Sequence, residues 1–367
     1  MEACMDFLDQ LVPDISLKIL MYLDDPSDLV RVSSVSRAWR HFVIANGVLK
    51  QFCLRMFPQL SRVAHVIELN KCKAEEPEEV GSSYSSEWES LERDHQVYAH
   101  LAGVCTSFLV GDCISKAICA SSTDNYPQES IDNTLQPADI VARMPSYWSS
   151  KGQTNPAVPE TLTYNLVNEF CVISEINMRP FQAYFQLGSP IYSAKSVRFR
   201  MGHSKIPADL GNDHLSGVSA GSADDKFIWT YTSQEFPMAQ ESCLQKFKLP
   251  EPVLCVGGIL QIELLGRVQR QEMDGLFYIC VSYVQVVGQS LSPVFGVEIL
   301  EPSGKFVLKH DMLCKFHAKS SIPENQHENT DGDLQRHLID WQHILDMLQG
   351  NGVIEIDELE MGEEEDE

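Results

Sequence analysis

The residues best suited to metal chemistry stand near the C-terminal end of the chain. His310, Cys314 and His317 form an H-x3-C-x2-H pattern, and imidazole and thiolate groups at such short spacing are typical zinc ligands. A structural zinc site needs four ligands, and no fourth candidate accompanies this group. We therefore expect no metal and no other cofactor.

A hydrolytic site is the second possibility for chemistry. Glu263 and Asp274 could form a pair of carboxylates for acid and base catalysis. An acidic chain offers many such pairs, however, and the sequence has neither an H-E-x-x-H metalloprotease motif nor a phosphate-binding loop. The chain is therefore predicted not to be an enzyme, and a sandwich-fold hydrolase is the less favoured alternative.

Polar residues that could bind a substrate gather in the segment from His203 to Lys226. The candidates are Asp209, Asn212, Asp213 and His214. Sugar sites usually combine such groups with an exposed aromatic ring, and none occurs before Phe227. Long loops on a rigid scaffold often carry recognition. The segment is therefore either a binding loop or a tolerated disordered insertion, and a lectin-like carbohydrate-binding module is one alternative function.

The charge of the chain argues against nucleic acid as a direct partner. Lys and Arg number 28 against 52 Asp and Glu, which gives 28 − 52 = −24, whereas nucleic-acid binding requires clustered cations. Nine of the acids lie between Glu355 and Glu367, without a Lys or Arg among them. Residues 351–367 are therefore predicted to form a solvated, disordered tail.

Cysteine usage and hydropathy suggest the compartment. The eleven cysteines are scattered without a C-x-x-C pair, which is typical of buried thiols in a reducing environment. No apolar stretch reaches the length of a membrane span. We expect a cytoplasmic or nuclear protein that has no membrane partner.

The first residues of the chain carry the pattern of a small helical bundle. Pro13 suits the first position of a helix, because its φ is already helical and its missing N–H would have no partner there. Apolar residues then follow on one stripe of a 3.6-residue period: Ile15, Ile19, Leu20 and Leu23. So small a bundle has a marginal core, and a partner or a neighbouring domain is expected to complete it.

Further helices are predicted from turn and cap residues. Pro26 opens a second helix, and Ser33 or Ser34 caps a third. Asn46-Gly47 ends the third helix, and a fourth short helix ends at Pro58. The conservative interpretation is a bundle that only packs against the rest of the chain.

The order of these residues resembles the F-box family. The matching set is Pro13, Ile19-Leu20, Leu23, Asp28-Leu29, Val35-Ser36 and Trp39-Arg40, with Val12 where the family usually has Leu. The resemblance implies that residues 5–58 dock on a Skp-type adaptor and, through it, on cullin and RING subunits. The chain would then be the substrate receptor of a ubiquitin ligase. The residues implied to contact the adaptor are Val12, Pro13, Ile15, Ile19, Leu20, Leu23, Leu29, Val35 and Trp39.

A connecting region is predicted over residues 59–119. Residues 71–86 mix charge, Gly, Pro and Ser and indicate a linker. Ser86 and Glu89 form a capping box that is expected to open a helix. The apolar run from Leu101 to Ala120 is expected to be a buried helix.

Residues 120–290 change to the pattern of a β-protein. Short runs rich in β-branched and aromatic residues occur at 162–166, 171–176, 194–201, 227–231, 258–265 and 276–287. Short strands separated by turn residues, without helical patterns between them, predict an antiparallel sandwich. Trp148 is expected to lie in its core.

Three segments of this region resemble a discoidin-type, galactose-binding-like jelly roll. They are Ala120-Ser121-Ser122, Ile131 to Leu135 and Tyr147-Trp148-Ser149-Ser150. The arginines of that family's last strand are absent here, so ligand chemistry is not carried over. With both features, the chain resembles a plant F-box subfamily that carries a jelly roll.

A C-terminal extension is predicted over residues 291–350. Asp333 can cap a helix that ends at Gly350, and its apolar stripe consists of Leu334, Leu338, Trp341, Leu345 and Leu348. This stripe is expected to pack on the sandwich, with a partner as the alternative. The predicted fold is thus an α+β multidomain protein with an all-α F-box bundle, a helical linker, an antiparallel β-sandwich and a C-terminal amphipathic helix.

Overall fold

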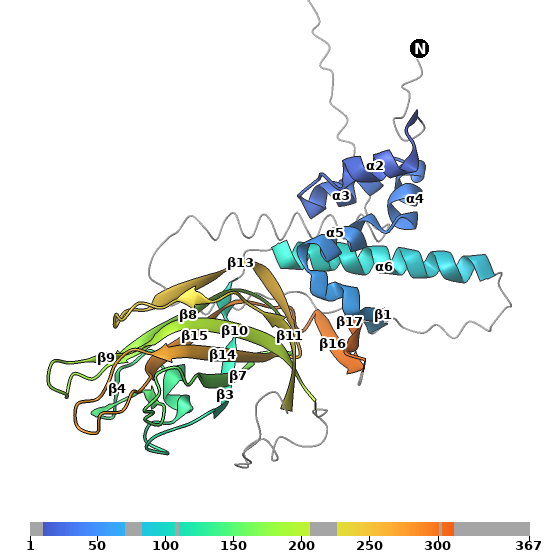
Figure 1. The fold of residues 1–367 in the computed structure, drawn as a ribbon. Coiled ribbons are helices and arrows are strands. Elements are labelled where there is room, and N and C mark those ends of the chain that lie inside the picture. The colour runs from blue at the N-terminus through green and yellow to red at the C-terminus, as the bar shows by residue number, and fades with distance from the viewer. Residues whose placement is uncertain (1–9, 70–82, 107–109, 206–225, 301–302, 312–367) are drawn as a thin grey trace, which may run out of the picture. The chain divides into compact units, whose positions relative to one another are not determined.

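The computed structural model of the chain describes residues 10–69, 83–106, 110–205, 226–300 and 303–311 (Figure 1). These residues divide into two compact units. The first contains the chain up to Phe52 together with the helix that follows Glu78, and the second contains the remaining described residues from Cys53 onward. The predicted helix after Asp333 and the predicted acidic tail lie outside the described residues.

The first unit is helical, as predicted. It consists of α2 (Pro13–Leu20), α3 (Pro26–Ser33), α4 (Arg37–Ala45) and α6 (Ser83–Thr106), and α5 (Val48–Met56) continues into the second unit. Pro13 and Pro26 both stand in the first turn of a helix, where their fixed φ favours the fold. The predicted helix starts at both prolines are therefore confirmed.

The caps of these helices follow side-chain chemistry. The Asp25 carboxylate accepts a hydrogen bond from the Ser27 N–H at 2.8 Å. The cap of α4 is Ser36, whose hydroxyl accepts from the Trp39 N–H at 3.2 Å, so the prediction of Ser33 or Ser34 is wrong. The Ser33 hydroxyl instead donates to the Val30 carbonyl at 2.6 Å inside the preceding helix.

Helix α6 completes the core of the first unit. The side chains of Leu29, Val43, Val97, Tyr98 and Leu101 are buried completely. Polar contacts reinforce this packing, because Arg40 forms an ion pair with Glu92 at 2.7 Å and His41 stacks on Trp88 with ring centroids 4.6 Å apart.

The segment from Leu101 to Ala120 is only partly helical, contrary to prediction. Helix α6 ends at Thr106, and the chain then forms β2 (Gly111–Asp112) and β3 (Ile114–Ala120). The Asp112 carboxylate accepts hydrogen bonds from the Ile114 and Val286 N–H groups at 3.1 and 3.2 Å. Pairing with distant strands therefore decides the structure of this apolar run, and its local pattern does not.

The second unit contains an antiparallel β-sandwich, as predicted. One sheet has the order β11 (Phe227–Thr232), β10 (Ala194–Ser204), β14 (Ile259–Arg267), β7 (Glu160–Leu166) and β3, with β12 (Phe236–Pro237) beside β10. The other has the order β13 (Gln245–Val256), β8 (Phe170–Gln182), β15 (Cys280–Ser290) and β2, with β6 (Trp148–Ser149) and β9 (Ile191–Tyr192) at its margins.

Alternate residues of both sheets fill the core between them. Val197, Phe199 and Met201 on β10 lie opposite Leu264, Ile262 and Leu260 on β14, and all six are buried. Trp148 is also fully buried, as predicted. This period-two burial fixes the register of the strands, because a shift by one residue would expose the apolar set.

A third, smaller sheet lies in the same unit. Its order is β1 (Val63–Leu69), β17 (Lys305–Asp311) and β16 (Phe295–Leu300), and β1 runs parallel to β17. The predicted connecting region 59–119 therefore contributes strands as well as a helix. Short elements complete the described structure: η1 (Pro58–Arg62), η2 (Ile131–Leu135), β4 (Ile140–Val141) and β5 (Met144–Pro145).

Candidate functional site

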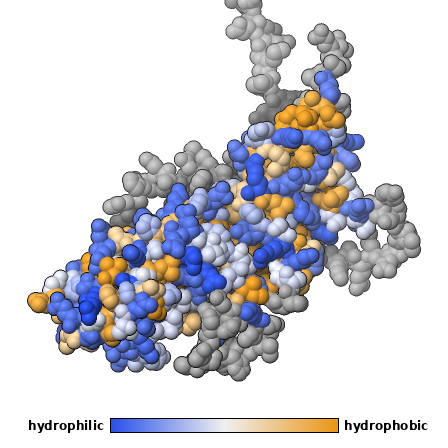
Figure 2. Space-filling model, in the orientation of Figure 1, coloured by the Kyte–Doolittle hydropathy of each residue, from blue (hydrophilic) through white to orange (hydrophobic). Residues whose placement is uncertain are grey.

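Helix α2 presents a row of apolar side chains to solvent. Val12 precedes the helix in an extended conformation and is 68 % exposed, and Ile15 and Ile19 follow at helical spacing and are also exposed. Ser16 and Leu20 lie on a different side of the helix and are buried. Figure 2 shows apolar surface over this part of the helical unit.

The residues implied to contact an adaptor separate into two groups. Val12, Pro13, Ile15, Ile19 and Val35 are exposed, and Leu23 and Trp39 are partly buried. Leu20 and Leu29 are buried inside the bundle, where they hold its shape. The apolar residues that the sequence pattern picks out therefore include both core residues and residues of an outer surface.

Tyr22 extends the exposed row and was not singled out from the sequence. Its side chain is 85 % exposed, and it follows Ile15 and Ile19 by seven and three positions. The signal that could have identified it is this spacing, which continues the same face just past the end of the helix.

Helix α6 adds charge and one buried histidine to the unit. Burial, and then the nearby Arg40 guanidinium, lower the pKa of His95 to about 4. Neither ring nitrogen of His95 has a hydrogen-bond partner among the described residues. The imidazole is therefore neutral near neutral pH and acts as a core residue.

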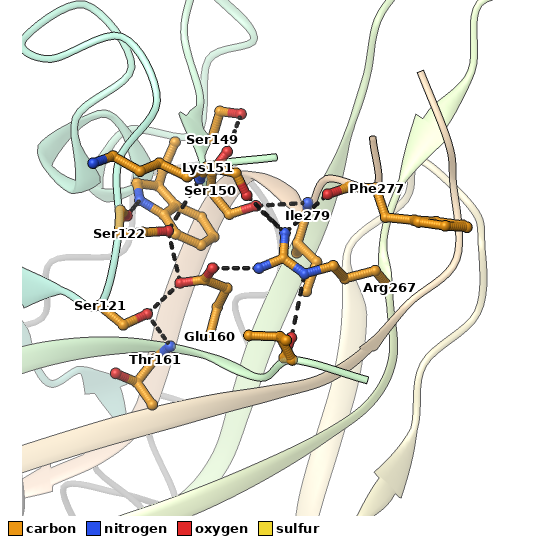
Figure 3. A network of polar contacts seen from close by, with 12 residues as sticks. Ser121, Ser122, Ser149, Ser150, Lys151, Glu160, Thr161, Arg267, Phe277 and Ile279 are labelled. Atoms are coloured by element: carbon orange, nitrogen blue, oxygen red, sulfur yellow. Dashed lines mark hydrogen bonds and ion pairs between the residues drawn. The ribbon is translucent and has the colours of Figure 1, made fainter. Parts of the chain in front are cut away.

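The sandwich contains a buried polar network around Arg267 and Glu160 (Figure 3). The two side chains form an ion pair. The Arg267 guanidinium also donates to the Ser150 hydroxyl at 2.8 Å and to the carbonyls of Lys151 and Phe277 at 2.9 and 3.0 Å. Charged groups are tolerated inside a protein when they are paired and hydrogen-bonded in this way.

The other side of this network fixes the serines of the sequence motifs. Glu160 accepts hydrogen bonds from the hydroxyls of Ser121 and Ser122, and the Trp148 indole donates to the Ser122 carbonyl at 3.0 Å. The motif segments at 120–122 and 147–150 are therefore joined by one structural network. The Glu160 carboxylate is buried, and its hydrogen bonds and ion pair occupy both oxygens. The network therefore stabilises the fold and has no oxygen free for a reaction.

The two carboxylates considered for catalysis, Glu263 and Asp274, are held by different partners. Glu263 accepts from Arg198 at 2.5 Å and lies 3.3 Å from Arg200. Asp274 instead accepts from the Tyr278 hydroxyl at 2.5 Å and from the Leu276 N–H at 2.9 Å. These contacts give no support to acid and base catalysis by the pair.

Four polar candidates for substrate binding come from the segment between His203 and Lys226. Asp209, Asn212, Asp213 and His214 lie outside the described residues. The same segment contains Gly217-Val218-Ser219-Ala220-Gly221, a G-x-S-x-G sequence. In hydrolases this motif forms a turn from a strand into a helix, whereas the flanking elements here are the paired strands β10 and β11.

The histidine and cysteine pattern near the C-terminus is only partly described. His310 is buried on β17 and stacks on Phe295 with ring centroids 4.9 Å apart, and Cys314 and His317 lie outside the described residues. No cluster of three or more metal-binding side chains occurs within the described ranges. Among the helices that the structure describes, none has the length and apolarity to cross a membrane.

Comparison with known proteins supports the interpretation of the helical unit. The family model described as F-box-like matches residues 11–55. A protein of Arabidopsis thaliana that is named as an F-box protein is 53 % identical over 308 residues, which cover 83 % of this chain and 82 % of that protein. The similarity therefore extends well beyond the helical bundle and includes most of the second unit.

The solved structures that are similar match about half of the chain. A family 32 carbohydrate-binding module of C. perfringens, solved with galactose, is 12 % identical and covers 47 % of this chain and 98 % of its own, with a TM-score of 0.29. A fucolectin from the striped bass Morone saxatilis is also 12 % identical. The match covers 50 % of this chain and 48 % of the fucolectin chain, with a TM-score of 0.29. At these scores the similarity does not bear on function.

Proposed function

The chain belongs to the F-box protein family, and from this premise we propose that it is the substrate-recognition subunit of a Skp-cullin-F-box ubiquitin ligase. The helical unit docks on the Skp-type adaptor, and the adaptor connects it to the cullin and RING subunits. The sandwich holds the protein substrate. Ubiquitin transfer takes place on the other subunits, so this chain requires no catalytic residue of its own.

The exposed apolar row of α2 carries the proposal. Val12, Ile15 and Ile19 project from a bundle that has a small core of its own, and contiguous apolar surface of this kind marks a protein interface. Burying each of these side chains in a complex contributes on the order of 1 to 2 kcal/mol. Leu20, which is buried on a different side of the helix, ties the row to the bundle core and so presents it as a rigid surface.

The proposed location is the cytoplasm or the nucleus. Every cysteine in the described part of the chain is a free thiol, and most of these thiols are buried, where they behave as small apolar side chains. This usage fits a reducing compartment such as the cytosol or the nucleus.

A binding experiment with the adaptor tests the docking step. The full chain is purified with a recombinant Skp-type adaptor, and the dissociation constant is measured by calorimetry for the wild type and for Ile15→Asp and Ile19→Asp. Each variant is expected to bind at least about tenfold more weakly, because a charge replaces an apolar contact without disturbing the core.

The matched control is Val110→Asp, which places the same charge on an exposed apolar residue of the second unit. This variant should bind the adaptor as the wild type does. If the α2 variants also bind with wild-type affinity while their circular dichroism is unchanged, the proposed docking surface is wrong.

A further inference from the structure

A second, separate aromatic cluster lies at one end of the sandwich. Its buried members are Phe181, Ala183, Tyr192 and Cys280, and Tyr147 and Tyr278 pack against them. Tyr147 stacks on Phe181 with ring centroids 3.9 Å apart, and Tyr192 meets Tyr278 edge-on at 6.3 Å. This aromatic cluster is distinct from the main core between the sheets.

The turn between β8 and β9 covers this cluster with exposed apolar side chains. Phe185 is 55 % exposed and Leu187 is 92 % exposed. Tyr184 is also exposed, and the rings of Tyr184 and Phe185 lie 5.9 and 6.2 Å from that of Phe181. The turn is thus an apolar projection that rests on aromatic side chains.

Hydrogen bonds hold this turn in one conformation. The Ala183 N–H donates to the Pro190 carbonyl and the Gln186 N–H to the Ala183 carbonyl, both at 2.9 Å. The Tyr192 hydroxyl donates to Oε1 of Gln186 at 2.6 Å, which joins the turn to the aromatic cluster. A surface held in this way loses little conformational entropy when a partner binds.

The hairpin of β4 and β5 adds a second apolar projection at the same end of the sandwich (Figure 1). Ile140 and Met144 are both exposed. Arg179, two residues before Phe181 on β8, anchors the hairpin through an ion pair with Asp139 at 2.8 Å. Ala142 and Arg143 form its tip with φ angles of 50° and 67°, values that cost free energy for residues other than glycine.

Carboxylates border the aromatic cluster. Glu129 accepts from the Tyr147 hydroxyl at 2.8 Å, and Asp274 accepts from the Tyr278 hydroxyl at 2.5 Å. The Asp124 N–H donates to the carbonyl of Ser149, two residues after Tyr147, at 3.1 Å, and burial and then the charges of Glu129 and Asp274 raise the pKa of its carboxyl group. Lys151 is the cation that acts on Asp124 in the opposite sense.

We propose that this end of the sandwich binds a protein segment in which an aromatic or aliphatic residue stands beside lysine or arginine. The inference rests on the proposed function as a substrate receptor and names the chemistry of the substrate. The apolar projections around Phe185 and Leu187 contact the apolar residue. The carboxylates of Asp124, Glu129 and Asp274 attract the cation, and the tyrosine faces can also accept it.

A peptide fits this surface better than a sugar. The projecting side chains of Leu187, Met144 and Ile140 have no group that can hydrogen-bond to sugar hydroxyls. Sugar and other small-molecule sites are concave and contain convergent polar groups, whereas this surface projects outward. Exposed apolar residues with a charged border are typical of protein interfaces.

A peptide selection tests the proposal. The full chain, purified with its Skp-type adaptor, is immobilised and used to select short random peptides displayed on phage. Peptides enriched on the wild type are expected to combine an apolar residue with an adjacent Lys or Arg. A synthetic copy of the most enriched peptide should bind about tenfold more weakly to Phe185→Ser/Leu187→Ser and to Asp274→Asn, and raising the salt concentration should weaken its binding to the wild type.

The matched control is Val167→Ser, an exposed apolar residue in the turn before β8, at the opposite end of that strand. It should select the same peptides as the wild type. Equal enrichment on the wild type and on the double variant, or enrichment of acidic peptides, overturns the proposal. A glycan array that binds the wild type but not the double variant would assign the surface to sugars instead and would also overturn it.

Adaptor binding separates this inference from the proposed function. All of these variants should keep wild-type affinity for the adaptor, because their substitutions lie in the second unit. If the adaptor binds but no peptide depends on the aromatic cluster, only the substrate inference fails. If the adaptor does not bind the wild type, the proposed function itself fails.

Discussion

Arg267 and Glu160 stand 107 residues apart in the sequence and form an ion pair inside the sandwich, with side chains that are 0 % and 3 % exposed. The pair connects the end of β14 to the start of β7. Its hydrogen bonds reach the loops around Ser122 and Ser150. One charged pair therefore holds together segments that the chain order keeps far apart.

Removing one partner of this pair should destabilise the sandwich strongly. Arg267→Met leaves the Glu160 carboxylate buried without its counter-charge, which costs about 3 to 5 kcal/mol. The free energy of unfolding is measured by denaturant titration of the full chain, followed by the circular dichroism of the strands.

Two further variants separate the cost of an unpaired buried charge from the cost of losing an arginine side chain. Arg267→Met/Glu160→Met removes both charges and should recover part of the loss. Arg198→Met removes a cation from the more exposed pair with Glu263 and should cost about 1 kcal/mol or less. A single Arg267 variant as stable as the Arg198 variant would contradict the prediction.

Buried His95 should make the helical unit less stable in acid. Its pKa is about 4 in the folded protein against about 6.5 for an unperturbed histidine, so the unfolded chain binds the proton more readily. The contribution of His95 to stability is complete above pH 6.5 and is lost as the pH falls toward 4. Between about pH 7.5 and 5.5 the loss is roughly 1 kcal/mol.

The measurement is the melting temperature across this pH range for the wild type and for His95→Gln, which is neutral at every pH. The difference between the two curves isolates the histidine from all other titrating groups. A wild-type curve that runs parallel to the His95→Gln curve would show that His95 takes up its proton equally well in the folded state.

Mutation can test the assignment of Ser36, and not the predicted Ser34, as the cap of α4. Ser36→Ala should cost about 1 kcal/mol because the Trp39 N–H loses its acceptor. Ser34→Ala should change stability little, since its hydroxyl reaches only the Val30 carbonyl at 3.5 Å. Hydrogen exchange of the α4 amides measures the local stability of the helix start. Faster exchange in Ser34→Ala than in Ser36→Ala would contradict the assignment of the cap.

Local chemistry explains which elements could be predicted from the sequence. Pro13 and Pro26 mark helix starts because a fixed φ acts within the residue itself. The strands β7, β8, β10, β11, β14 and β15 were predicted because their residues favour a pleated surface. Strand β13 was missed because Pro250 and Pro252 interrupt its pattern, and it tolerates them as an edge strand with a register shift after Lys248.

The features that could not be predicted depend on contacts between distant residues. Strand β3 forms because β7 lies beside it, and nothing in residues 114–120 indicates that neighbour. The role of Arg267 depends on Glu160 and Ser150 in the same way. The resemblance implied that Val12, Ile15 and Ile19 contact the adaptor, but it implied the same for the buried Leu20 and Leu29, since spacing alone does not show which apolar residues a small bundle leaves outside.

Tyr22 should contribute to adaptor binding together with this row. It is 85 % exposed, so Tyr22→Ala should leave the melting temperature unchanged. Tyrosine is common among the residues that dominate interfaces, and truncating one such residue typically costs about 1 to 2 kcal/mol, or roughly five- to thirtyfold in affinity. The control is Tyr126→Ala, which removes a similarly exposed ring from the sandwich unit. Calorimetry with the Skp-type adaptor should show weaker binding for Tyr22→Ala alone, and equal affinity of both variants would place Tyr22 outside the interface.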